Sequence, residues 1–122
     1  MPKGKQVIVL YEGDSHSIEL AITEDGECPA KDFLDGLPEG KKAQVLRIIK
    51  RLADLGKIHH REQFKKVEDD FFEFKYFQIR MPCFFLPNRR VVITHGFIKK
   101  GDRIGEGQIL RMKRIRKEYE GK

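Results

Sequence analysis

The chain has 122 residues and a formal net charge of +6, and 36% of its residues are charged. This length predicts a single domain spanning residues 1–122, and the basic balance favours an anionic partner such as nucleic acid or an acidic protein segment. Because no apolar run reaches the length of a membrane span or forms the core of a signal peptide, we expect a cytoplasmic protein that makes no membrane contact.

Hydrophobic periodicity in the first third of the chain predicts two strands followed by two helices. Residues 7–11 form a short apolar run rich in β-branched side chains, and residues 17–22 alternate between apolar and polar positions. Both patterns are typical of strands, and the turn between them predicts a hairpin. A short helix is expected over residues 29–34. Residues 39–55 carry apolar side chains on one half of a helical wheel, which predicts an amphipathic helix ended by Gly56.

Three consecutive strands are predicted after a polar segment. Residues 57–70 are expected to be mostly loop, with an early strand near Phe64. Pro82 falls inside one of the apolar runs that follow, and because proline cannot donate to a strand ladder, it implies a bulge or an outward-facing position. A tight turn is expected at residues 86–89. The three strands are expected at residues 71–77, 79–86 and 90–98.

A last helix is predicted at residues 106–119. Its apolar side chains recur at helical spacing, and basic side chains cover the rest of its surface. The order of the elements predicts an α+β fold, in which two to three helices pack on a small, twisted and mainly antiparallel sheet. The apolar stripe of this helix consists of Ile109, Met112, Ile115 and Tyr119.

Ionic side chains recur at set positions within the predicted strands. Glu73 and Lys75 are two residues apart and therefore share one face of their strand, which we expect to be the open face of the sheet. If the next strand pairs through a turn at residues 77–78, Arg80 lies close to Lys75. Lys99 and Lys100 end the third strand and can join this patch from its far end.

A cluster of cations with one carboxylate suits the cleavage of a phosphodiester bond. The 2′-hydroxyl of RNA has to lose a proton, the charge on phosphorus has to be stabilised, and the 5′-oxygen has to gain a proton. A lysine among other cations has a lowered pKa and can act as the base. The alternative interpretation is that Glu73, Lys75 and Arg80 form cross-strand ion pairs on a solvated face. Further phosphate contacts are expected from Arg103, Arg111 and Arg114.

The histidines and cysteines predict no metal site and no cofactor. Cys28 and Cys83 are far apart in the sequence, and the spacing of the histidines fits no zinc motif. His95 lies among apolar residues and is expected to be a hydrogen-bonded structural side chain. His59 and His60 lie in a polar loop and are expected to be exposed, with the alternative that one of them reaches the patch as an acid or base.

The second half of the chain resembles the RelE/ParE superfamily of bacterial toxins, and most closely its HigB-like, phage-derived branch. The resemblance is carried by Phe-Glu-Phe-Lys at residues 72–75, by Arg80 and the apolar residues after it, and by His-Gly-Phe-Ile-Lys-Lys at residues 95–100. The first half matches more loosely. Two departures stand out, because Lys75 replaces an arginine that the branch prefers and no tyrosine or histidine closely follows Lys100. Tyr119 lies further along the last helix.

This resemblance implies a compact fold similar to that of microbial ribonucleases. It also implies a toxin that cleaves mRNA on the ribosome without a metal ion and is neutralised by a cognate antitoxin, often a helix-turn-helix protein. The catalytic positions of the branch correspond to Lys75, Arg80, Lys100 and Glu73, and replacing Arg80 with alanine is expected to abolish toxicity without unfolding the protein. Two alternatives are a ParE-like inhibitor of DNA gyrase and a nucleic-acid-binding protein without catalytic activity.

Overall fold

A mixed, mostly antiparallel sheet forms the middle layer of the computed structural model, which describes residues 7–101 and 105–121. Its strand order is β1-β2-β6-β5-β4-β3, and β7 pairs with β5 beyond the end of β6. All neighbours are antiparallel except β2 and β6. The strands are β1 (Ile8–Glu12), β2 (Ser17–Leu20), β3 (Phe64–Glu68), β4 (Phe71–Tyr76), β5 (Ile79–Leu86), β6 (Arg90–Ile93) and β7 (Phe97–Ile98).

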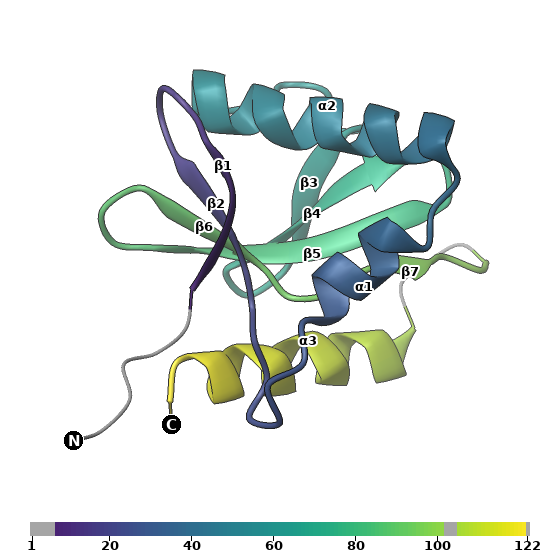
Figure 1. Cartoon of the computed structure of the whole chain (residues 1–122). Helices are drawn as coiled ribbons and strands as arrows, with labels where there is room; N and C mark the ends of the chain where they lie inside the picture. Colours follow the sequence, from purple (N-terminus) through teal and green to yellow (C-terminus); the bar gives the residue numbers. More distant parts are fainter. Residues whose placement is uncertain (1–6, 102–104, 122) are drawn as a thin grey trace.

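Helices cover both faces of this sheet (Figure 1). The helices α1 (Pro29–Asp35) and α2 (Glu39–Leu55) pack on one face, and α3 (Glu106–Tyr119) packs on the other. The predicted α+β class is therefore confirmed. Within the described residues, none of the helices is long and apolar enough to span a membrane.

The apolar faces of the two long helices explain this layered arrangement. One core lies beneath α2, where Ile49 and Leu52 are at most 1% exposed, and a second core lies beneath α3, where Met112 and Ile115 are fully buried. Each large buried side chain contributes roughly 1.5–3 kcal/mol of gross stabilisation. Gly56 ends α2 with a φ of 84°, a left-handed conformation in which its N–H donates to the carbonyl of Leu52.

The predicted strand over residues 90–98 is interrupted, and this part of the prediction is wrong. Cys83 pairs with Ile93 and Arg80 pairs with Phe97, so three residues of one strand face two residues of the other. The extra residue is a bulge opposite Pro82, whose carbonyl accepts a hydrogen bond from the N–H of Thr94 at 2.9 Å. The nitrogen of Pro82, which has no hydrogen to donate, faces this interrupted segment between β6 and β7. Of the two positions that the proline implied, a bulge or an outward-facing one, the structure has the bulge.

The short strand β2 lies between β1 and β6 and holds the end of α3. Its Glu19 is 4% exposed and accepts hydrogen bonds from Arg90 at 2.5 and 2.9 Å and from the Tyr119 hydroxyl at 2.9 Å. Burial raises the pKa of Tyr119, and the bond to Glu19 raises it further. Tyr119 therefore serves the packing of α3 against β2, toward the edge of the sheet opposite to the one formed by β3 and β4.

Candidate active site

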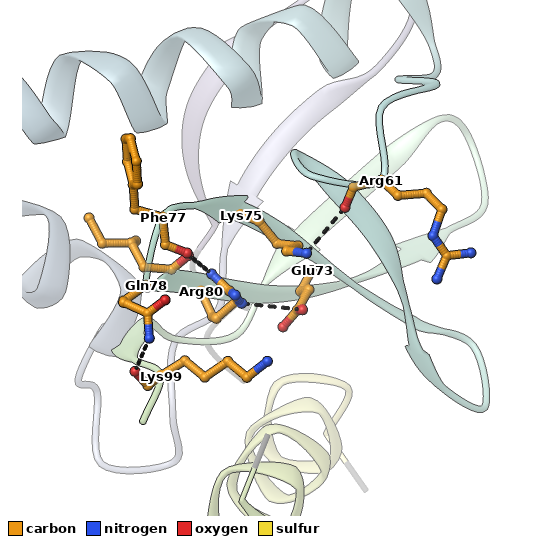
Figure 2. Close-up of polar contacts among 8 residues, drawn as sticks. Arg61, Glu73, Lys75, Phe77, Gln78, Arg80 and Lys99 are labelled. Carbon is orange, nitrogen blue, oxygen red and sulfur yellow. Dashed lines mark hydrogen bonds and ion pairs between the residues drawn. The ribbon is translucent and has the colours of Figure 1, made fainter. Parts of the chain in front are cut away.

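The β4–β5 hairpin brings Lys75 and Arg80 together. The two residues are directly paired across the strands, so their side chains leave the same face of the sheet, as the sequence predicted. Glu73 precedes Lys75 on that face and pairs with Pro82. Figure 2 shows these side chains just behind the hairpin turn, with Lys99 reaching along the same side from the end of β7.

Glu73 and Arg80 form a buried ion pair. The Glu73 Oε2 atom lies 3.5 Å from Arg80 Nε, and the two side chains are 4% and 7% exposed. The expectation that Glu73 lies on an open face is therefore wrong. The reason is that α3 covers this face, with Phe71 and Phe84 of the sheet in the same core as Met112.

The buried pair leaves hydrogen-bonding capacity unused. Among the described residues, Glu73 Oε1 and Arg80 Nε are buried side-chain atoms without a hydrogen-bond partner. The other end of Arg80 is held, since its Nη1 donates to the carbonyls of Phe77 and, at 3.0 Å, Ile79. Burial raises the pKa of Glu73, while Arg80 and the neighbouring lysines act in the opposite direction. A buried polar group without a partner is costly, so these two atoms lower the stability of the fold.

Lys75 lies at the margin of this pair and is partly exposed. Its Nζ donates to the carbonyl of Arg61 at 3.3 Å. Burial lowers the pKa of Lys75, and the positive charges of Lys65 and Arg80 lower it further. The direction agrees with the expectation from the sequence, although burial contributes more than the neighbouring cations.

Two further lysines act on this cluster. Lys65 of β3 pairs directly with Glu73, and its charge lowers the pKa values of both Glu73 and Lys75. Sequence reasoning missed Lys65, because its role depends on the register of a strand that the sequence indicated only weakly. The charge of Lys99 also lowers the pKa values of Glu73 and Lys75. Its backbone N–H donates to the carbonyl of Gln78 at 2.7 Å, and its carbonyl accepts a hydrogen bond from the Gln78 side chain at 2.9 Å.

A concavity opens beside this cluster. Its volume is about 400 Å³, and it lies between the end of the β4–β5 hairpin, the start of β3 and the middle of α2. Both cations of the pair across the hairpin contribute to its wall, so an anion entering it meets Lys75 and Arg80 together. The lining residues are Ile48, Glu62, Gln63, Lys75, Tyr76, Phe77 and Arg80.

The remaining predicted site residues lie elsewhere or are not described. Lys100 is exposed one residue beyond Lys99. Arg111 and Arg114 lie on α3 near His95, whose pKa they help to lower, and Arg114 reaches Glu118 at 3.5 Å along the helix. Arg103 lies outside the described residues.

The histidines lie as the sequence predicted. His95 is fully buried, with Nδ1 at 3.0 Å from the hydroxyl of Thr94 and Nε2 at 2.9 Å from the amide oxygen of Gln108. His59 and His60 are exposed. Among residues 7–101 and 105–121, no group of three His, Cys, Asp or Glu residues is placed to hold a metal ion.

An α+β fold with a cationic cluster at a hairpin end defines a small protein suited to bind an anionic ligand such as nucleic acid. The family model "Phage derived protein Gp49-like (DUF891)" matches residues 32–117, which include Glu73, Lys75 and Arg80. The chain belongs to this Gp49-like phage-derived family, a toxin-like family related to RelE-type toxins. A comparison with curated proteins found no match.

Proposed function

We propose that this protein is the HigB-like toxin of a type II toxin–antitoxin module and cleaves mRNA on the ribosome without a metal ion. Its membership of a toxin-like family and the resemblance of residues 72–75 and 95–100 to the HigB-like branch support this proposal. A cognate antitoxin, expected to be a helix-turn-helix protein, would neutralise it. The net charge of +6 suits both partners, because mRNA and ribosomal RNA are polyanions.

The observation that carries the proposal is the pairing of Lys75 with Arg80 at the wall of the concavity. One cation is guanidinium, which is always charged and can neutralise a phosphate. The other is an amine whose pKa is lowered by burial, so that more of it is neutral near physiological pH than in an ordinary lysine. A permanent cation beside a potential base is the combination that cleavage through the 2′-hydroxyl requires.

In the proposed reaction, the neutral amine of Lys75 takes the proton of the 2′-hydroxyl. The 2′-oxygen attacks phosphorus, the bond to the 5′-oxygen breaks, and a cyclic 2′,3′-phosphate and a 5′-hydroxyl result. Arg80 stabilises the extra negative charge on the phosphoryl oxygens during the attack. Glu73 is assigned to holding Arg80 in place, because its carboxylate is buried behind the guanidinium.

The proton for the leaving 5′-oxygen is assigned to the lysine pair at the end of β7. Lys99 is the stronger candidate, because its charge lowers the pKa values of both Glu73 and Lys75 and its backbone is hydrogen-bonded to Gln78 of the hairpin turn. Lys100 is exposed and can contact the next phosphate of the RNA.

The proposal is tested by expressing the protein from a tightly controlled promoter and mapping the 5′ ends of cellular transcripts. We expect new 5′ ends inside coding frames, lost in Lys75→Met and kept in Lys117→Met, an exposed lysine of α3. Lys75 is a better probe than Arg80, because its side chain is partly exposed and its removal leaves no buried charge unpaired. Growth arrest with intact transcripts would contradict the nuclease and favour gyrase inhibition, and an absence of arrest would favour a binding protein.

A further inference from the structure

Phe77 stands out among the described apolar side chains because it is both large and exposed. Its exposed fraction is 79%, the highest among the exposed large hydrophobic residues of the described chain. It occupies the first position of the two-residue turn between β4 and β5, with a φ of 53°. Hairpins favour glycine or asparagine where φ is positive, so a phenylalanine here is costly to the fold and points to another role.

Two contacts hold Phe77 in the turn, one made by its ring and one by its backbone. The ring lies 4.8 Å from that of Tyr76 in an edge-on arrangement with an interplanar angle of 87°. Its backbone carbonyl accepts a hydrogen bond from the guanidinium of Arg80. Figure 2 shows the ring projecting outward from the turn while the backbone carbonyl points back to Arg80, so the same residue holds the guanidinium and presents an aromatic ring.

Phe77 also shares the wall of the concavity with Lys75 and Arg80. An aromatic ring beside cations is the arrangement by which proteins bind single-stranded nucleic acid, because bases stack on the ring while the phosphates contact the charges. Stacking depends little on sequence, since every base has a π-face. An anchor for a protein partner would instead be part of a continuous apolar patch, whereas the concavity around Phe77 carries two cations.

We propose that Phe77 is a stacking platform for a base of single-stranded RNA, next to the phosphate held by Arg80. This inference rests on the proposed function for the identity of the ligand as RNA. The ring contacts a base and takes no part in proton transfer, so its loss weakens binding and leaves the chemistry of bound RNA intact.

The experiment measures the affinity of the purified protein for two short fluorescent probes by anisotropy at low salt. One is a single-stranded oligoribonucleotide with 2′-fluoro sugars, which lacks the nucleophile and cannot be cleaved. The other has the same length and phosphate charge but no bases. Phe77→Gly is the main variant, because glycine adopts the positive φ without strain, and we therefore expect the fold to be retained. Phe77→Leu keeps an apolar side chain, Phe77→Trp keeps an aromatic ring, and Leu55→Ala removes another exposed apolar side chain, at the end of α2.

We expect Phe77→Gly and Phe77→Leu to bind the base-bearing probe about tenfold more weakly, since stacking on one aromatic ring has roughly that effect. Phe77→Trp and Leu55→Ala should match the parent protein, and all variants should bind the abasic probe alike. Equal affinity of Phe77→Gly and the parent protein for the base-bearing probe would overturn the inference, whether or not the parent protein cleaves RNA. Base-dependent binding through Phe77 by a protein that leaves mRNA intact on translating ribosomes would support it and contradict the nuclease.

Discussion

Glu73 and Arg80 form an ion pair inside the protein, with Oε2 and Nε 3.5 Å apart and neither side chain more than 7% exposed. The pair joins β4 to β5 on the face that α3 covers, so Arg80 contributes to the interior as well as to the wall of the concavity. Removing one partner of such a pair leaves a buried charge uncompensated, which is far more costly than removing both.

Arg80→Ala is therefore expected to lose activity and stability together, which revises the sequence-based expectation of an intact fold. We expect a loss of about 3–5 kcal/mol of unfolding free energy, because the Glu73 carboxylate then lies buried without its partner. The double variant Glu73→Gln/Arg80→Ala should be less destabilised than the sum of the two single changes, Glu73→Gln and Arg80→Ala. Urea unfolding of the four proteins at neutral pH measures this. Additive losses would show that the pair is not coupled.

The pH dependence of cleavage tests Lys75 as the base. Because burial lowers its pKa, the rate should rise with pH and level off below the ordinary lysine value, where the amine becomes neutral. Lys75→Arg keeps the positive charge but cannot lose its proton, so it should bind RNA and fail to cleave it. Single-turnover cleavage of an mRNA bound to ribosomes, in the presence of excess protein, measures both effects. A Lys75→Arg variant with the parent rate would assign Lys75 to phosphate binding alone.

The helices and the hairpin site were predictable from the sequence, because both depend on local patterns. Helical periodicity and Gly56 define α2, and the two-residue turn after Tyr76 places Lys75 opposite Arg80. The burial of Glu73 was not predictable, since alternation along β4 assigns it to one face but says nothing of the helix that covers that face. The role of Lys65 required the register of β3 against β4.

The bulge opposite Pro82 illustrates the same limit. The proline indicated an irregularity in or beside β5. Whether the bulge formed against β4 or against the segment between β6 and β7 depended on which of them the nitrogen of Pro82 faced. The interruption at residues 94–96 also separates the buried His95 from Lys99, which lies beside the cluster. Because the sequence predicted an unbroken strand over residues 90–98, it could not show whether Lys99 or Lys100 lies nearer to Glu73 and Lys75.

His95 makes stability dependent on pH. Burial lowers its pKa from 6.5 to about 4, so between these values the unfolded chain binds a proton that the folded protein excludes. Stability is therefore present above about pH 6.5 and is lost as the pH falls toward 4, by up to about 3 kcal/mol. Urea unfolding across this range measures the loss, and His95→Gln should show a shallower dependence. An unchanged slope in that variant would assign the acid sensitivity to other groups.

Gly96 of the His-Gly-Phe-Ile-Lys-Lys segment is explained by packing, because the ring of Phe33 in α1 lies against its backbone. A Cβ atom placed on Gly96 would be 2.2 Å from Cδ2 of that ring. Gly96→Ala should therefore destabilise the protein by about 1–3 kcal/mol, the typical effect of overpacking. Gly107→Ala is the matched control, since nothing lies within 4 Å of its added methyl group.

The double variant Phe33→Leu/Gly96→Ala separates this contact from a direct effect of alanine on the backbone. Gly96 has no positive φ that alanine would strain, so the cost should come from the ring alone. A smaller side chain at residue 33 gives the new methyl group room, and the double variant should be more stable than the sum of the single changes predicts. Thermal unfolding of the three variants measures this coupling. If the losses were additive, the glycine would be required for a reason other than its contact with Phe33, such as the path of the chain between β6 and β7.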